Sequence, residues 1–263
     1  MPFVRVGPLP PWMPERDLLG SAEWLRQPDG SVTASLTREQ AADVQARLRG
    51  LAFAGLDLAV QVRPALKRPL VRAGRLREAR ARRNTTPGFE HPMARLDEEG
   101  RRSLTPESLA LDLGHRARGR SVLDLTCGAG GNAIGFARAG CAVTAVELSP
   151  ERLADARFNA NLYKVASKIT FKQGDALQAI QAHTASLVFI DPPWAGWDHR
   201  RTTLDDLPLL GALLERMPTN QSWWAKVPPS FDVEGLQVSV EPWFGRASGD
   251  RHRVKFLLLQ GGQ

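Results

Sequence analysis

The stretch SVLDLTCGAGGNAIGFARAGCAVTAVEL (121–148) determines the fold class of this 263-residue chain. Residues 121–127 form a short apolar run of strand length, and glycines follow it directly. The next residues have helical spacing up to Gly140, and residues 142–148 again have the composition of a strand. A strand, a glycine turn, a helix and a second strand predict two neighbouring parallel strands with a helix packed on one face.

The same alternation continues toward the C-terminus. Further strands are expected at 169–175, 186–193 and 222–227, with helices at 149–163 and 204–216. The last two strands, 236–244 and 252–260, leave no room for a helix between them, which predicts an antiparallel hairpin. For residues 91–263 we therefore predict an α/β domain with a doubly wound, mostly parallel sheet and an antiparallel last strand. Five parallel strands that end in such a hairpin resemble the class I methyltransferase fold.

Residues 1–90 have a different character. They are rich in alanine, leucine and arginine and contain few β-branched runs. Thr37 and Gln40 have the spacing of a capping box, which predicts the start of a helix that continues to near Gly55. The stretch 66–83 is also expected to be helical. The sequence therefore predicts an N-terminal helical region in front of the α/β domain.

The charge of the chain is concentrated in one segment. The net charge is +7, and residues 63–83 contain nine basic residues and one acidic residue, so all other residues sum to −1. Such a local concentration favours contact with a polyanion, and nucleic acid is the partner that we expect. The alternative is a solvated helix face in a chain that is rich in arginine.

The remaining composition excludes several classes of protein. No apolar run approaches the roughly 18 residues of a membrane span, and the N-terminus lacks an apolar signal core, so no membrane contact is expected. Cys127 and Cys141 do not form a disulfide framework, which favours a reducing, cytoplasmic location. The five histidines are scattered without ligand spacing, so no metal is predicted.

A cofactor site is expected where the strands end. The glycine turn allows a ligand to approach the backbone, and it exposes helix N–H groups that bind a carboxylate. Glu147 and Asp175 end the next two strands, where they could accept the ribose hydroxyls and reach an adenine amino group. A dinucleotide is the alternative, but the glycines lack the G-x-G-x-x-G spacing. Asp124, in front of the glycines, is typical of methyltransferases, and this resemblance implies S-adenosylmethionine.

Asp191-Pro192-Pro193-Trp194 follows the fourth strand and is the candidate catalytic motif. It resembles the [N/D/S]-P-P-[aromatic] signature of enzymes that methylate the exocyclic amines of adenine, cytosine and guanine. Such an amine is a poor nucleophile, because its lone pair is delocalised into the ring. Hydrogen bonds to Asp191 and to the Pro192 carbonyl would orient it toward the methyl donor, and a base stacked on Trp194 gains about 1–3 kcal/mol. A proline turn beside a core tryptophan is the alternative.

The chain resembles a specific family, the trimethylguanosine synthases or RNA cap guanine-N2 methyltransferases. The resemblance covers about residues 96–196 and rests on these stretches: LDEEGRRSLTPE (96–107), DLTCGAGGNAIGFARAG, VELSP, NANLYKV, KITFKQGD and DPPWAG. It implies that Thr105 and Pro106, with Phe89, close the cofactor pocket from the N-terminal side. The family usually has serine in place of Asp191, and the first 85 residues match nothing in it. The resemblance implies guanine N2 in RNA as the expected target. Because of these departures, adenine N6 in RNA or DNA is kept as the second.

Together these patterns assign two further sets of residues. Cofactor contacts are expected from Thr105, Pro106, Asp124, Thr126, Cys127, Gly128, Gly130, Gly131, Asn132, Glu147, Leu148, Asp175 and Ala176. Substrate contacts are expected from Trp194, Trp197, Arg200, Arg72 and Arg75, with solvated surface positions as the alternative for the arginines. A methyltransferase for small-molecule or protein amines remains open, and so does a cofactor-binding protein without activity.

Overall fold

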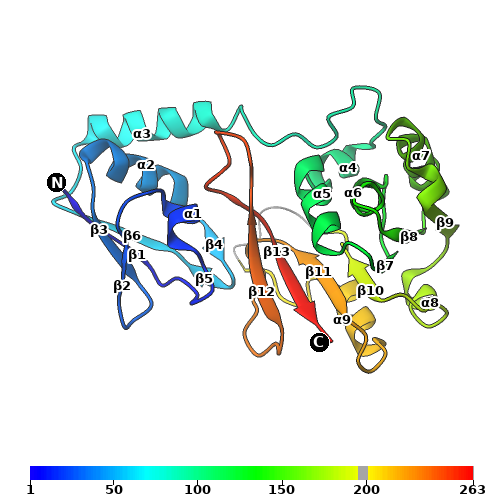
Figure 1. The fold of residues 1–263 in the computed structure, drawn as a ribbon. Helices are drawn as coiled ribbons and strands as arrows, with labels where there is room; N and C mark the ends of the chain where they lie inside the picture. The colour runs from blue at the N-terminus through cyan, green and yellow to red at the C-terminus, as the bar shows by residue number, and fades with distance from the viewer. Residues whose placement is uncertain (195–200, 263) are drawn as a thin grey trace.

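The computed structural model describes residues 1–194 and 201–262, and its larger part is a seven-stranded sheet (Figure 1). The strand order is β12-β13-β11-β10-β7-β8-β9, and all neighbours are parallel except that β13 is antiparallel to both β11 and β12. The bounds are β7 Ser121–Asp124, β8 Ala142–Glu147, β9 Ile169–Gln173, β10 Leu187–Ile190, β11 Trp223–Val227, β12 Ser239–Phe244 and β13 Val254–Gly261. The predicted mostly parallel sheet with an antiparallel last strand is confirmed.

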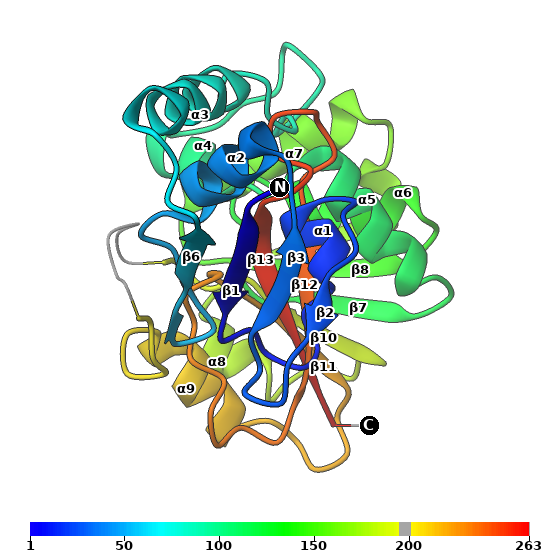
Figure 2. The same cartoon turned by 90° about the vertical axis from the view of Figure 1, so that its left-hand side faces the viewer.

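Helices cover both faces of this sheet (Figures 1 and 2). Along β10, Leu187 and Phe189 belong to the apolar cluster under α5, α6 and α7, whereas Val188 and Ile190 belong to the cluster that includes α8 and α9. Because side chains alternate between the faces of a strand, a strand between two helix layers is apolar at every position. The helices are α5 Glu107–Arg116, α6 Gly131–Arg138, α7 Pro150–Leu162, the 3-10 turn Ala166–Lys168, α8 Ala176–Ala179 and α9 Pro208–Glu215.

Two glycines bring α5 close to α6, the helix that follows the glycine turn. A Cβ on Gly135 would lie 2.4 Å from the carbonyl oxygen of Ala110, and one on Gly114 would lie 2.4 Å from the carbonyl oxygen of Gly135. No larger residue fits at this crossing without moving the backbone. The segment just before α5 is thereby held beside the glycine turn.

Residues 1–90 are rich in β-strands, so the prediction of an N-terminal helical region was wrong. An antiparallel sheet with the order β2-β3-β1-β6 forms there. The elements are β1 Phe3–Gly7, α1 Glu15–Leu19, β2 Leu25–Arg26, β3 Val32–Ser35, α2 Arg38–Leu48, β4 Ala52–Phe53, β5 Leu56–Asp57, β6 Ala59–Arg63 and α3 Arg68–Ala81. The capping box of Thr37 and Gln40 is confirmed, but α2 ends at Leu48 because the β4–β5 hairpin follows.

The N-terminal sheet packs against the end of the larger sheet. Val4 and Val6 belong to the same buried cluster as Leu257 and Leu259 of β13. The segment that leads from α3 to α4 (Glu98–Ser103) is also anchored there, since the Thr86 backbone N–H and hydroxyl each donate to the buried Asp250 carboxylate over 2.8 Å. This anchoring places α4 over the carboxyl ends of the parallel strands.

Candidate active site

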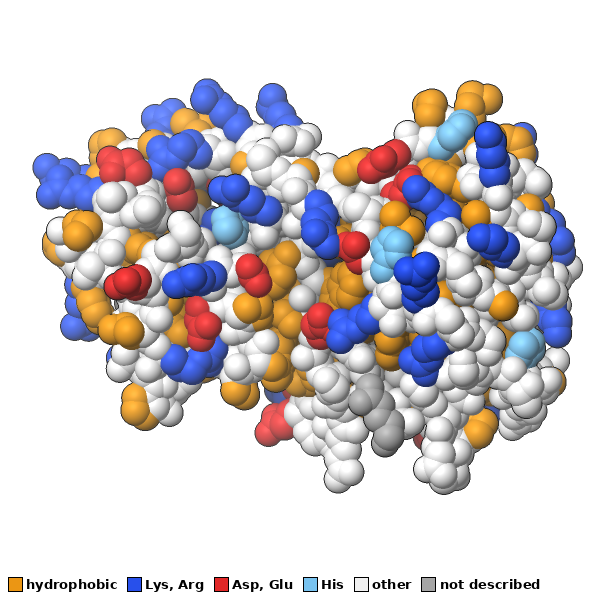
Figure 3. All heavy atoms as spheres, viewed as in Figure 1, with side chains coloured by type: hydrophobic (Ala, Val, Ile, Leu, Met, Phe, Trp, Pro, Cys, Tyr) orange, Lys and Arg blue, Asp and Glu red, His pale blue; other side chains and the backbone are white. Residues whose placement is uncertain are grey.

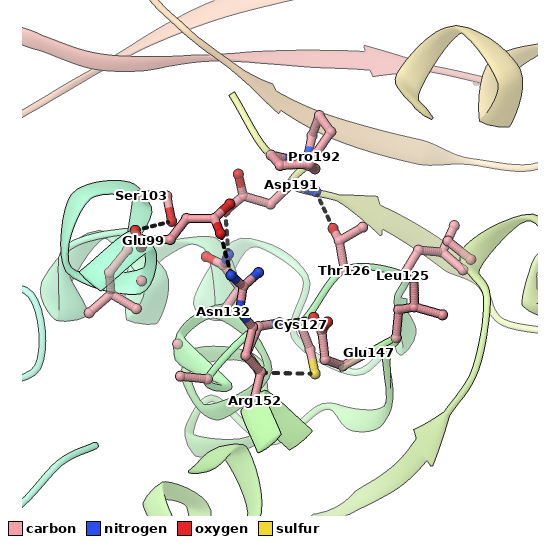
Figure 4. Close-up of a pocket in the computed structure, with 18 of the residues that line it drawn as sticks. Glu99, Ser103, Leu125, Thr126, Cys127, Asn132, Glu147, Arg152, Asp191 and Pro192 are labelled. Atoms are coloured by element: carbon pink, nitrogen blue, oxygen red, sulfur yellow. Dashed lines mark hydrogen bonds and ion pairs between the residues drawn. The ribbon is translucent and has the colours of Figure 1, made fainter. Parts of the chain in front are cut away.

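A cavity of about 320 Å³ lies at the carboxyl ends of β7, β8, β9 and β10 (Figure 4). Residues from the glycine turn, the strand ends and α4 form its wall. The predicted residues that line it are Thr105, Thr126, Cys127, Gly128, Gly131, Asn132, Glu147, Leu148, Asp175, Ala176, Asp191, Pro192 and Pro193. The parallel topology therefore brings together most of the side chains that the sequence indicated.

Glu147 organises the glycine turn. Its Oε2 accepts a hydrogen bond from the Gly128 backbone N–H over 2.9 Å, and its Oε1 accepts one from the Ser149 N–H over 3.0 Å. Gly128 and Gly130 have φ values of 53° and 91°, which favour glycine, and Gly130 is the N-cap of α6. The carboxylate thus fixes the conformation of the turn through these hydrogen bonds, and it also faces the cavity.

Asp175 has two roles in the structure. It lines the cavity, and as the N-cap of α8 its Oδ1 accepts the Leu177 N–H over 2.6 Å. Helix capping alone would explain an acid at this position. Its place in the wall, across from Glu147 on the neighbouring strand, is what makes it available to a ligand as well.

Asp124 lies beneath the cavity and does not line it. The side chain is fully buried, and its Oδ1 accepts the Thr126 N–H over 3.3 Å. Burial, and to a smaller extent the neighbouring charges of Asp191 and Glu147, raise the pKa of this carboxyl to about 8. Pro106 and Gly130 also lie outside the wall of this cavity. The contact with the cofactor that the sequence led us to expect from these three residues stays a prediction.

Asp191 is the centre of a buried polar network that sequence reasoning missed. Lys226 Nζ and Asn132 Nδ2 each donate to Asp191 Oδ2 over 2.9 Å, and Lys226 also donates to the Ser103 carbonyl over 3.0 Å. The side chain of Lys226 is only 3% exposed. Burial raises the pKa of Asp191, whereas the ion pair with Lys226 lowers it, and the net direction is upward. The only signal in the sequence was a lysine inside the apolar strand SWWAKV.

A second cavity, of about 520 Å³, adjoins the first and shares Leu96, Ser103 and Leu104 with it. Trp194 lines this second cavity together with Phe89 and Phe256. Asp191, Pro192 and Pro193 line the first cavity, so the motif 191–194 lies at the junction of the two. A methyl donor in the first cavity and an aromatic methyl acceptor in the second would both lie next to Asp191.

The remaining predicted residues do not lie at this junction. Arg72 and Arg75 are exposed on α3 and line neither cavity. Trp197 and Arg200 lie outside the described residues. Pro106 lines the second cavity rather than the first.

Comparison with known proteins agrees with this geometry. Residues 119–218, from the start of β7 to just after α9, match the family described as RNA cap guanine-N2 methyltransferase. The matched segment holds the glycine turn, the strand-end acids and the motif 191–194, so the similarity to this family lies in the residues around the two cavities. The chain is similar to trimethylguanosine synthase of Saccharomyces cerevisiae, with 32% identity over 115 residues, which are 40% of this chain. The match spans 36% of that relative's length.

Solved structures of methyltransferases are distantly similar to part of this chain. An RNA methyltransferase of Salinibacter ruber in complex with S-adenosyl-L-homocysteine has a TM-score of 0.39 at 21% identity, covering 59% of this chain and 87% of that one. A precorrin-6y C5,15-methyltransferase of Geobacter metallireducens has a TM-score of 0.44 at 13% identity, covering 66% and 96%. TM-scores this low carry no conclusion about function.

The side chains of this segment fit S-adenosylmethionine. The turn at Gly128–Gly131 offers backbone N–H groups to the carboxylate of the cofactor, and two strand-end carboxylates face the same cavity. Asn132 Oδ1 is buried and has no hydrogen-bond partner among the described residues, so it can accept from a bound ligand. Within the described residues no group of His, Cys, Asp and Glu is placed to hold a metal, and no helix is long and apolar enough to cross a membrane.

Glu147→Gln should weaken binding of S-adenosylhomocysteine by roughly tenfold to a hundredfold, because it removes the charge-assisted hydrogen bonds that we expect this carboxylate to form with the ribose. Titration calorimetry measures this affinity. Glu151→Gln, which changes an exposed acid in the first turn of the following helix α7, is the matched control and should leave the affinity unchanged. An unchanged affinity in Glu147→Gln would remove Glu147 from the cofactor site.

Asp124 should make the apo protein less stable as pH rises. Its folded pKa of about 8 exceeds the ordinary value of 3.8, so between these values the folded state holds a proton that the unfolded state has lost. The free energy of unfolding therefore falls with rising pH across this window and levels off above it. Urea unfolding at several pH values measures the free energy of unfolding, which should fall less steeply with rising pH in Asp124→Asn than in the wild type. An identical slope in the variant would mean that Asp124 is ionised in the fold.

Proposed function

We propose that this protein transfers a methyl group from S-adenosylmethionine to an exocyclic amino group of a nucleic-acid base, most specifically N2 of guanine in RNA. The observation that supports it best is the position of residues 191–194, with Asp191 in the wall of the first cavity and Trp194 in the wall of the second. A methyl donor and a stacked base would then reach the same carboxylate from opposite sides.

The geometry of Asp191 suits the reaction. Lys226 and Asn132 both donate to Oδ2, so we assign Oδ1 to the substrate amine. The amine nitrogen attacks the methyl carbon, the bond from that carbon to the sulfonium sulfur breaks with its electron pair remaining on sulfur, and the nitrogen then loses a proton. A carboxylate that accepts an N–H of the amine directs the nitrogen lone pair toward the methyl group, which is catalysis by orientation. The positive sulfonium is a good leaving group, so this step requires no strong base.

The first experiment follows labelled methyl from S-adenosylmethionine into total cellular RNA, followed by digestion to nucleosides. Label in N2-methylguanosine would support the full proposal. Label in N6-methyladenosine would keep the reaction and overturn guanine as the base. Transfer to small amines or protein but not to RNA or DNA, by a protein that binds S-adenosylhomocysteine, would overturn the nucleic-acid substrate.

Helix α3 supports a role in binding the RNA backbone. Every basic residue of 63–83 is exposed, and in the space-filling view positive side chains gather along the edge that α3 forms (Figure 3). Arg77 and Arg82 have carboxylate partners, whereas Arg72 and Arg75 form no ion pair with any described residue. Unpaired, exposed guanidinium groups on one helix are available to phosphates, which would position RNA without reading its sequence.

The variant Arg72→Glu/Arg75→Glu should weaken RNA binding and reduce its dependence on salt. Each lost phosphate contact lowers the slope of log affinity against log salt by about 0.7 for single-stranded RNA. Filter binding between low and moderate salt measures this slope. Arg216→Glu, an exposed arginine after α9 on the opposite side of the molecule, is the control (Figure 1). An unchanged slope in the double variant would exclude α3 from the interface.

A further inference from the structure

We propose that the second cavity binds an uncharged base with its phosphate, as found inside an RNA chain, and discriminates against a positively charged 7-methylguanine cap. This inference rests on the proposed function and specifies its substrate. It concerns the side chains around Trp194, and it runs against what the name of the matched family describes.

The charged side chains that line this cavity are all basic. Arg101, Arg102, Lys226 and Lys255 are in its wall, and no Asp or Glu is among the described residues that line it. Arg101 is exposed on α4 and forms no ion pair with a described residue. A cavity with this lining attracts a phosphate and repels a cationic ring.

The carboxylates that balance these cations lie outside the cavity. Lys255 pairs with Asp250 over 3.2 Å, and the Asp250 side chain is completely buried. Lys226 pairs with Asp191, which lines the cofactor cavity instead. Arg102 pairs with Glu98, whose side chain is 81% exposed and lies outside the wall. In each pair the cation is in the wall of the second cavity and the carboxylate is not, so the charged groups along this wall are positive.

The aromatic surface already has a cation beside it. Lys226 Nζ lies 4.8 Å from the centre of the Trp194 ring and 5.6 Å from that of Phe256. A tryptophan holds a cationic base by interaction of the positive charge with the negative face of its ring. Here a buried ammonium makes that interaction with Trp194, so a second positive charge stacked on the same ring would be repelled. A neutral base loses nothing by stacking there.

Three mononucleotides separate charge from shape: GMP, 7-methyl-GMP, and 7-methyl-7-deaza-GMP, which has the shape of the second and a neutral ring. Their affinities are measured by calorimetry with S-adenosylhomocysteine bound, at mildly acidic pH where the 7-methylguanine ring keeps its charge. We expect the two neutral nucleotides to bind at least about tenfold more tightly than 7-methyl-GMP. Equal or tighter binding of 7-methyl-GMP would overturn the proposal, and so would the failure of all three to bind.

Charge reversal at the cavity tests the cause. Arg101→Glu should weaken the binding of GMP. It should also reduce the ratio of the affinity for GMP to that for 7-methyl-GMP by a factor of about 3 or more. Arg118→Glu, an exposed arginine after α5 that lines neither cavity, should change neither value. A preference that survives Arg101→Glu unchanged would overturn the electrostatic explanation. The labelled-methyl assay on RNA reports the proposed function separately, because it does not depend on mononucleotide binding.

Discussion

Asp191→Asn should lower the rate of methyl transfer by at least about a hundredfold. Lys226 and Asn132 both donate to the Oδ2 position, so an amide placed there would turn its oxygen toward these two donors. Its NH₂ group would then occupy the Oδ1 position and face the substrate amine. Two donors in opposition cannot form the hydrogen bond that orients the amine, and they push the nitrogen away from the methyl group.

Single-turnover transfer of labelled methyl to RNA measures this effect apart from product release. The affinity for S-adenosylhomocysteine should stay within about threefold of wild type, since the amide keeps the shape of the carboxyl group. Asp205→Asn makes the same chemical change at an exposed position and is the matched control. A single-turnover rate for Asp191→Asn within a fewfold of wild type would show that Asp191 does not hold the substrate amine.

The α/β part of the chain could be predicted because its signals are local. Leu187–Ile190 is apolar at each position because helices cover both of its faces, and the glycine turn lies immediately between a strand and a helix. Once the strands are known to be parallel, their carboxyl ends must meet at one edge. The assembly of Glu147, Asp175 and Asp191 around one cavity follows from that rule alone.

The N-terminal sheet could not be predicted in the same way. Its strands are two to five residues long, so the alternation of buried Val4 and Val6 with exposed Phe3 and Arg5 gives little signal. The two longest elements of the region are α2 and α3, and these dominated the pattern. The buried residues of the short strands share one apolar cluster with Leu257 and Leu259 of β13, about 250 residues further along the chain, and no local pattern records this.

Lys226 escaped sequence reasoning for a different reason, which is the register between two strands. Val188 pairs with Trp223 and Ile190 pairs with Ala225 in the parallel ladder of β10 and β11. One step further along, Asp191 comes opposite Lys226. A shift of one residue in this ladder would turn the lysine to the other face of the sheet. The sequence does not state the register, so the ion pair could not be read from it.

Lys226→Met should destabilise the fold by about 3–5 kcal/mol, which lowers Tm by roughly 6–20 °C, because Asp191 would remain buried without its cation. The pKa of Asp191 should also rise, since burial raises it and the opposing charge of Lys226 would be gone. If the reaction needs the carboxylate, the rise of rate with pH should then move to higher pH in the variant. Thermal unfolding and a pH profile of single-turnover rates measure the two effects.

The double variant Lys226→Met/Asp191→Asn separates the stability of the pair from its chemistry. Replacing both members by neutral groups removes the unpaired buried charge, so the double variant should recover at least about half of the stability that Lys226→Met loses. It should remain inactive, because the carboxylate is absent. A double variant as unstable as Lys226→Met would instead assign the role of Lys226 to its contacts with Trp194 and the Ser103 carbonyl. In that case the ion pair would contribute little to stability, and it would form only because packing between the two cavities brings Lys226 next to Asp191.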